Sequence, residues 1–291
     1  MGALERLADA ARRMPGERTK SRVGRVIASF AARAGAEAVV SVTLRDGTRL
    51  ILDARGRTEG SAVWTGRYDD ATLDVLRLCV PSGGVLLDVG ANVGLISLPM
   101  ARHLAASGGT VIAVEPVAVN AARIRQSAPL NNVDVDVLEM ALGDQHGLIE
   151  ISRDDSLGAE SGNAVMGRPG AGYGPTSTVE IRRLDDLGSR VGQVHVIKVD
   201  IEGAELLFLR GARQFIGHWR PLIFGEFHSG LMPKFGGTFA DVSPLLAEWS
   251  YKIIAWEGHR QPVVVEAEAG RGNAMLVPSE RLDEVLAALK G

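Results

Sequence analysis

Short apolar runs alternate with segments of helical periodicity between residues 85 and 277, and this alternation constrains the fold most strongly. The apolar runs lie at residues 85–89, 110–114, 133–138, 194–199, 222–227, 252–256 and 274–277. Helical periodicity is found at residues 95–106, 117–128, 204–214 and 242–249. Strands that alternate with helices form mostly parallel sheets covered on both faces. A polar loop without helical periodicity separates the last two runs. We therefore expect an α/β protein with a seven-stranded, mostly parallel sheet and a terminal antiparallel hairpin.

The N-terminal part of the chain has a different pattern. Residues 1–35 are rich in Ala, Arg and Leu and predict helices that are interrupted at Met14-Pro15-Gly16. Residues 38–53 alternate between apolar and polar side chains on both sides of Asp46-Gly47. Alternation around Asp-Gly is typical of a β-hairpin. We expect a helical and hairpin extension in front of the main sheet.

These patterns predict two parts of the chain, residues 1–60 as the extension and residues 61–291 as the main domain. Residues 153–177 form a long polar segment that is rich in Gly, Ser and Pro. Long loops inside compact domains are usually functional lids or linkers. Because apolar strands flank this segment on both sides, a mobile lid is favoured over a domain boundary.

Charge and cysteine content exclude several classes of protein. The chain has 32 basic and 35 acidic residues and a formal net charge of -3, which argues against a general nucleic-acid binder. The single cysteine, Cys79, excludes an internal disulfide framework, and its apolar surroundings predict a buried thiol. No apolar run is long enough to span a membrane, and charges interrupt every apolar run near the N-terminus. A cytoplasmic location is the default expectation.

The first informative motif follows the first strand of the main sheet. An apolar strand ends at Asp88, and Gly90 to Gly94 form the turn into a helix. Glu115 follows the next strand about twenty residues later, where a carboxylate can accept both hydroxyls of a ribose. An acidic residue at the position of Asp88 suits the positive sulfonium of S-adenosylmethionine and would repel the pyrophosphate of NAD. The motif therefore favours S-adenosylmethionine over a dinucleotide.

The third strand of the sheet is followed by Met140 and Ala141. In this topology the end of that strand lies beside the adenine of a bound nucleoside. These two residues are candidates for packing against the base, although an ordinary core strand followed by a turn explains them nearly as well.

Five segments together resemble the FkbM-type methyltransferase family: LLDVGANVGLIS, VIAVEP, MALGD, RRLDDL and KVDIEGAE. The resemblance covers roughly residues 60 to 280. It implies a Rossmann-like class I methyltransferase fold and S-adenosylmethionine-dependent O-methylation of sugars, polyketides or other secondary metabolites. It also implies cofactor contacts at Asp88, Gly90, Asn92, Gly94 and Glu115. Its signature positions at the catalytic end of the sheet are Asp200, Glu202 and Glu205.

Methyl transfer to an alcohol requires a base or a metal ion that activates the oxygen. Asp200 and Glu202 follow the fourth strand, whereas Glu226 and His228 belong to the fifth and share one face of it. By analogy with class I sugar and catechol O-methyltransferases, Asp200 and Glu226 are expected to bind Mg²⁺ or Mn²⁺. His228 is expected to be a third ligand or the general base, beside Glu202 and Asp200 as catalytic candidates. The alternative is that Asp200 and Glu202 cap the following helix.

The sequence thus predicts an O-methyltransferase whose partner is a small molecule with a hydroxyl group, such as a saccharide. A homodimer formed through the N-terminal region is a further expectation. Two alternatives remain open at this point, a NAD-dependent oxidoreductase on a similar sheet and a non-catalytic protein that binds S-adenosylmethionine.

Overall fold

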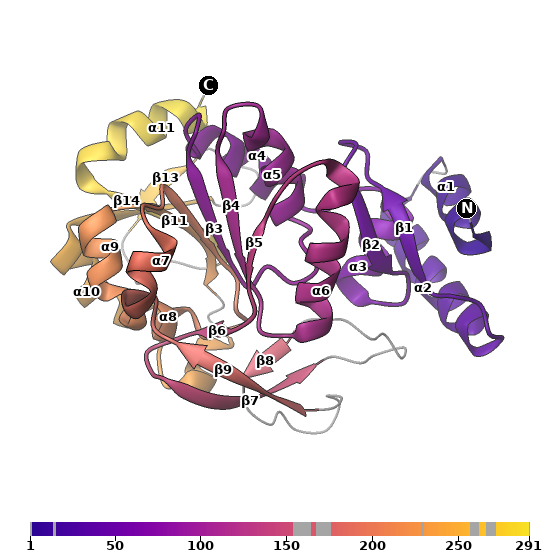
Figure 1. Cartoon of the computed structure of the whole chain (residues 1–291). Coiled ribbons are helices and arrows are strands. Elements are labelled where there is room, and N and C mark those ends of the chain that lie inside the picture. The colour runs from indigo at the N-terminus through magenta and orange to yellow at the C-terminus, as the bar shows by residue number, and fades with distance from the viewer. Residues whose placement is uncertain are drawn as a thin grey trace.

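A large mixed sheet forms the centre of the molecule (Figure 1). The computed structural model describes residues 2–13, 16–153, 164–166, 176–227, 230–256, 262–265 and 272–290. Within these residues the sheet has the strand order β13-β12-β14-β11-β10-β3-β4-β5. Its strands are β3 (Val85–Val89), β4 (Thr110–Val114), β5 (Asp136–Leu138), β10 (Val196–Val199), β11 (Leu222–Phe227), β12 (Tyr251–Ala255), β13 (Val263–Val265) and β14 (Gly272–Pro278).

The strand directions agree with the predicted pattern. Five neighbouring strands are parallel to one another, in the order β11, β10, β3, β4 and β5. Strand β14 is antiparallel to both β11 and β12. All seven predicted runs form strands of this sheet. The predicted number of strands is wrong for the described residues, because β13 adds an eighth strand at the edge. Its three valines favour extended backbone, but they lie within the segment that the sequence predicts as a polar loop.

Helices cover both faces of the sheet. One face carries α4 (Asp70–Cys79), α5 (Ser97–Ala105), α6 (Ala118–Ser127) and α11 (Leu282–Lys290), and the other carries α7 (Gly188–Val191), α8 (Glu205–Gly211), α9 (Arg213–Trp219) and α10 (Ser243–Trp249). Successive side chains of β3 point to opposite faces of the sheet. Leu86 packs in the core on the α5 side, and Leu87 packs in the core on the α8 side. The helix predicted at residues 204–214 is divided into α8 and α9, and α4 and α11 have no counterpart among the predicted helices.

The N-terminal part contains the predicted hairpin, and its first two helices lie on either side of the predicted break, of which Met14 and Pro15 lie outside the described residues. It consists of α1 (Ala3–Arg12), α2 (Glu17–Arg33), β1 (Val39–Thr43), β2 (Arg49–Asp53) and α3 (Arg57–Thr65). Helices α2 and α3 approach each other closely at Gly24. Any side chain at this position would collide with the ring of Trp64. Helix α3 runs across the predicted boundary at residue 60, so the division into two domains stays a prediction.

The hairpin is joined to the main domain along the edge of β2. The N–H of Ile51 donates a hydrogen bond of 3.0 Å to Oγ of Ser127, at the end of α6. The N–H of Arg49 donates to Oδ1 of Asn131 at 2.8 Å, and Nδ2 of Asn131 donates to the carbonyl oxygen of Arg49 at 2.7 Å. These side chains pair with the backbone at the free edge of β2 and hold the N-terminal part beside α6 (Figure 1).

A second, smaller sheet lies beyond β5. Its strands are β6 (Ala141–Leu142), β7 (Gly147–Arg153), β8 (Ala164–Met166) and β9 (Thr176–Arg182), in the order β6-β9-β7-β8 among the described residues. The segment predicted as a lid connects β7 and β9. Residues 154–163 and 167–175 of that segment lie outside the described residues, and the lid stays a prediction.

Two further predictions concern the burial of Cys79 and the absence of an apolar segment long enough to span a membrane. Cys79 is buried as expected, and burial raises the pKa of its thiol to about 11. Across the described residues, no helix combines the length and the apolar character required to cross a bilayer.

Candidate cofactor-binding site

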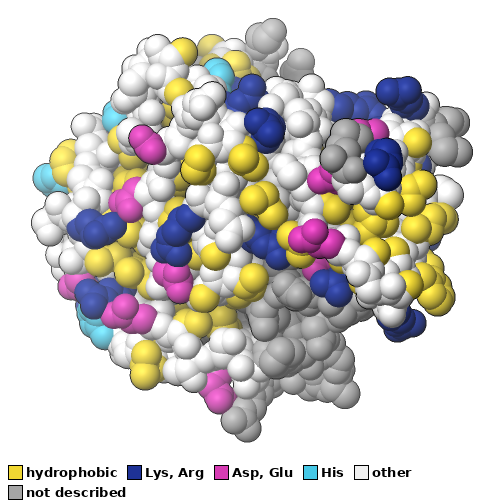
Figure 2. All heavy atoms as spheres, turned by 45° about the vertical axis from the view of Figure 1, so that its right-hand side comes forward, with side chains coloured by type: hydrophobic (Ala, Val, Ile, Leu, Met, Phe, Trp, Pro, Cys, Tyr) yellow, Lys and Arg dark blue, Asp and Glu magenta, His cyan; other side chains and the backbone are white. Residues whose placement is uncertain are grey.

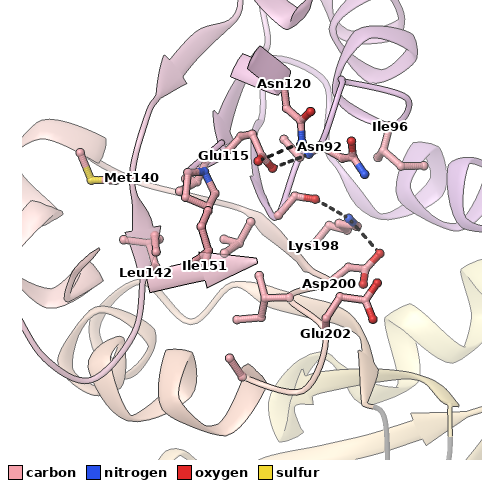
Figure 3. A pocket seen from close by; sticks show the side chains of 18 of the residues that line it. Asn92, Ile96, Glu115, Asn120, Met140, Leu142, Ile151, Lys198, Asp200 and Glu202 are labelled. Atoms are coloured by element: carbon pink, nitrogen blue, oxygen red, sulfur yellow. Dashed lines mark hydrogen bonds and ion pairs between the residues drawn. The ribbon is translucent and has the colours of Figure 1, made fainter. Parts of the chain in front are cut away.

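A cavity opens at the carboxyl ends of β3, β4 and β10, the edge at which open α/β sheets bind their ligands. It encloses about 920 Å³, including the part that is open to solvent. Figure 3 shows carboxylates at two ends of this cavity, Glu115 at one and Asp200 with Glu202 at the other. The apolar side chains of Met140, Leu142 and Ile151 form a wall on another side of the cavity, to the left in Figure 3, away from Asp200 and Glu202.

The turn after β3 forms one side of the cavity. Gly90 has a φ of 79° and Asn92 a φ of 51°, both in the left-handed region. A side chain at Gly90 would collide with the carbonyl oxygen of Asp200, so this turn requires a glycine. Gly90 and Asn92 line the cavity as predicted, whereas Gly94 does not line it. Gly94, with a φ of 84°, turns the chain towards α5.

Glu115 lies at the bottom of the cavity with only 4% of its surface exposed. The N–H of Asn92 donates to its Oε2 at 2.8 Å, while the N–H of Val117 and Nδ2 of Asn120 donate to its Oε1 at 2.9 and 3.2 Å. Burial raises the pKa of Glu115 to about 7, although these donors act in the opposite direction. A carboxylate has about four lone-pair sites, so Glu115 can still accept a hydrogen bond from a ligand.

Asp88 occupies a different position from the one that the sequence predicts. It is fully buried and is not among the residues described around the cavity. Oγ of Ser97 donates to its Oδ2 at 2.5 Å, and Nζ of Lys198 lies 3.3 Å from its Oδ1. Lys198 is the cation beside this carboxylate in the structure, and a contact between Asp88 and a ligand cation stays a prediction. Through its contacts with Ser97 and Lys198, Asp88 connects β3 to α5 and to β10.

Lys198 is the residue that sequence reasoning missed. It is buried, it lines the cavity, and its Nζ lies 3.6 Å from Asp200. Its Nζ also donates to the carbonyl oxygen of Gly90 at 3.4 Å. Burial alone would lower the pKa of Lys198, but the charges of Asp88 and Asp200 outweigh it and raise the pKa above the ordinary lysine value. A lysine within an apolar strand was the available signal, yet its partner Asp88 follows only from the register of β10 with β3.

The loop after β10 places two carboxylates at the other end of the cavity. Asp200 and Glu202 both line it, as predicted, and their side chains lie next to each other in Figure 3. Glu202 has a φ of 55°, an unusual conformation for a glutamate that points to a functional constraint. The buried Glu205 maintains this loop, since its Oε1 accepts from the N–H of Gly203 at 2.9 Å. The family signature at Glu205 therefore has a structural explanation.

The apolar wall comes from parts of the chain that are distant in sequence. Met140 and Ala141 line the cavity as predicted, and Leu142 continues the wall. Ile151 comes from β7 of the smaller sheet, and no sequence motif indicates its presence here. Tyr68 reaches the cavity from the loop before α4, and burial raises the pKa of its hydroxyl. The site is thus built by three regions: the main sheet, the smaller sheet and the loop between α3 and α4.

The predicted metal site is not supported by the described residues. Glu226 is not among the residues described around the cavity, and His228 lies outside the described part of the chain. Within that part, no group of three His, Cys, Asp or Glu side chains is arranged to hold a metal ion. The positive charge beside Asp200 comes from Lys198. We therefore derive no step through a metal ion.

The sequence of the main domain matches a known family. A model described as the methyltransferase FkbM domain matches residues 88–253, more than half of the chain. The chain belongs to the FkbM methyltransferase family. Its match to methyltransferase sdnD of Sordaria araneosa is 25% identical over 244 residues, which is 71% of this chain and 92% of that protein.

Solved structures are also similar to this FkbM-family chain. The FkbM methyltransferase of Methylobacillus flagellatus KT aligns with a TM-score of 0.41 at 16% identity, covering 67% of this chain and 44% of that chain. A tRNA (uracil-54, C5)-methyltransferase of Pyrococcus abyssi aligns with a TM-score of 0.42 at 15% identity, covering 83% and 45%. This chain therefore spans less than half the length of either solved structure.

Family membership confirms two of the predictions. The chain is a methyltransferase-family protein, which selects this class over the NAD-dependent oxidoreductase. The fold is the Rossmann-like class I methyltransferase fold, with an antiparallel strand, β14, inserted between β11 and β12.

Proposed function

We propose that this FkbM-family chain is an S-adenosylmethionine-dependent O-methyltransferase that acts on a hydroxyl of a small saccharide-like or secondary-metabolite acceptor. One observation carries the proposal. A single cavity is lined by the fixed carboxylate of Glu115, by the carboxylates of Asp200 and Glu202 at some distance from it, and by an apolar wall on another side.

The side chains around the cavity fit this cofactor. S-adenosylmethionine carries an ammonium and a sulfonium cation and no phosphate, which suits a cavity with three carboxylates. Glu115 is placed to accept a hydrogen bond from a ribose hydroxyl, and Met140 and Leu142 offer an apolar surface for the adenine. When bound, the cofactor supplies an electrophilic methyl group.

The chain must remove a proton from the acceptor, because a neutral alcohol is a weak nucleophile. In our proposal Glu202 accepts the proton of the acceptor hydroxyl. Asp200, with Nζ of Lys198 at 3.6 Å, positions the acceptor through hydrogen bonding. The backbone of the loop holds both carboxylates in place through Glu205. Tyr68 covers part of the cavity and limits the access of water.

The acceptor class is supported by the composition of the cavity lining. Tyr68 provides an aromatic side chain there, and aromatic faces pack well against sugar rings. Trp64, by contrast, is buried in the N-terminal core and does not reach the cavity. The homodimer, the cytoplasmic location and the catalytic role of His228 stay predictions.

Calorimetry with S-adenosylhomocysteine on cofactor-free protein tests the cofactor, and a methyl-transfer screen over saccharides and natural-product alcohols tests the reaction. We expect Glu202→Gln to lower kcat by roughly 100-fold or more and to change cofactor affinity by less than about threefold. Glu37→Gln, at an exposed glutamate in the N-terminal part, is the matched control and should behave as the wild type. Absence of saturable S-adenosylhomocysteine binding would refute the proposal.

A further inference from the structure

A second hollow lies next to the cofactor cavity, and the side chain of Tyr68 lines both. It encloses about 1200 Å³, including the part that is open to solvent. Its walls come from α2, from α3 and from the loop that leads into α4. The arginines around it are Arg18, Arg22, Arg25 and Arg67.

The spacing of the arginines places them on one side of this hollow. Arg18, Arg22 and Arg25 are separated by four and three residues, so they share one face of α2. Arg18 and Arg22 are exposed, and neither forms an ion pair with any residue that the structure describes. Their charges are available to a ligand.

The acidic residues of the hollow are already engaged. Oδ1 of Asp69 accepts a hydrogen bond from the N–H of Thr72 at 3.2 Å and caps α4. Asp70 forms an ion pair with Arg67. Because four arginines and two aspartates line the hollow, it keeps an excess of positive charge even with both carboxylates ionised.

The wall that carries the arginines is held in place by close packing. A side chain at Gly60 of α3 would collide with the aliphatic part of Arg25, and one at Gly24 of α2 would collide with Trp64. Nε of Arg25 also donates to the carbonyl oxygen of Ser21 at 3.3 Å. A wall fixed in this way reduces the entropy cost of binding a ligand.

We propose that this arginine hollow binds an anionic group of the methyl acceptor: a phosphate, a sulfate or a carboxylate. Guanidinium groups bind these anions through paired, charge-assisted hydrogen bonds. The acceptor then extends past Tyr68, so that its hydroxyl reaches Glu202 in the adjoining cavity. This inference rests on the proposed function and adds that the acceptor is an acidic small molecule.

The charge of the rest of the molecule favours a small anion over a nucleic acid. The chain has a net charge of -3. On the described surface visible in Figure 2, Lys and Arg side chains are interspersed with Asp and Glu side chains and form no continuous basic area.

A binding experiment with inorganic phosphate as the probe tests the hollow directly. Phosphate affinity is measured by calorimetry at low salt for the wild type, for the Arg18→Gln/Arg22→Gln double variant and for Arg33→Gln. Arg33 is an exposed arginine of the same helix outside the hollow, so it is the matched control. We expect the double variant to bind phosphate roughly tenfold more weakly or worse and Arg33→Gln to bind like the wild type.

The same three proteins are titrated with S-adenosylhomocysteine, which should bind all of them equally. If the wild type fails to bind S-adenosylhomocysteine, the proposed function is refuted. If it binds S-adenosylhomocysteine but not phosphate, or if Arg33→Gln weakens phosphate binding as much as the double variant, this inference alone is refuted. Tighter binding of an RNA oligonucleotide than of phosphate, lost in the double variant, would overturn it in favour of a polyanion site.

Turnover provides a second readout. Acceptors found in the methyl-transfer screen should carry an acidic group, and for them the double variant should raise KM at least about tenfold with little change in kcat. Acceptors that are all neutral, or an unchanged KM in the double variant, would contradict the inference.

Discussion

Glu115 gives the sharpest test of the site, because its environment couples stability and cofactor binding to pH. Burial raises its pKa from the ordinary value of 4.5 to about 7. The folded chain therefore keeps a proton that the unfolded chain releases. This contribution to stability is fully present below about pH 4.5 and is lost as pH rises through about 7. Between pH 5 and pH 8 the loss amounts to about 2–3 kcal/mol.

The variant Glu115→Gln isolates this effect. Glutamine does not titrate, but its amide nitrogen faces an N–H donor, either that of Asn92 or that of Val117. This mismatch costs about 1–3 kcal/mol at every pH. The difference in unfolding free energy between wild type and variant should therefore favour the wild type most at pH 5 and shrink by about 2 to 3 kcal/mol by pH 8. Urea unfolding of both proteins at several pH values measures it.

Cofactor binding should show the opposite dependence on pH. Ribose hydroxyls donate to Glu115 best when it is ionised, and with a pKa of about 7 the ionised fraction rises from about 10% at pH 6 to about 90% at pH 8. The Kd of S-adenosylhomocysteine should fall roughly tenfold over this range in the wild type and stay constant in Glu115→Gln. A Kd of the wild type that is independent of pH, or an equal slope in both proteins, would refute this reasoning.

Three further predictions concern the rest of the site. Lys198→Met leaves the buried carboxylate of Asp88 without its ion-pair partner and should destabilise the protein by about 3–5 kcal/mol in urea unfolding, with recovery in the Asp88→Asn/Lys198→Met double variant; no recovery would contradict the pairing. Gly90→Ala introduces a side chain against the backbone of Asp200 and should weaken S-adenosylhomocysteine binding at least about tenfold, and retained affinity would contradict the close approach. Because Lys198 provides the positive charge beside Asp200, turnover should persist in EDTA, and activity that is lost in EDTA and restored by Mg²⁺ would show a metal requirement.

Much of the site follows from local sequence. The turn through Gly90 and Asn92, the carboxylate of Glu115 and the pair Asp200 and Glu202 all lie where their motifs predict, at the carboxyl ends of parallel strands. These residues could be predicted because each directly follows an apolar strand, and parallel strands end at the same edge of a sheet.

The errors arise where the role of a side chain depends on contacts across strands or between distant segments. The partners of Asp88 could not be predicted, because they are Lys198 on the neighbouring strand and Ser97 of α5, and its contact with a ligand stays a prediction. The edge strand β13 was not predicted, because its three residues are too few to show a periodic pattern within a polar segment.

The order of apolar runs and turn residues in the sequence was sufficient to determine the α/β class, the strand sequence of the main sheet and the positions of its ligand-binding turns. These features depend on residues that are close together in the chain. The tertiary structure decided that Lys198 neutralises two carboxylates, that Ile151 and Tyr68 complete the cavity, and that the arginines of α2 lie beside it. These contacts join segments far apart in sequence, and only the packing of the folded chain brings them together.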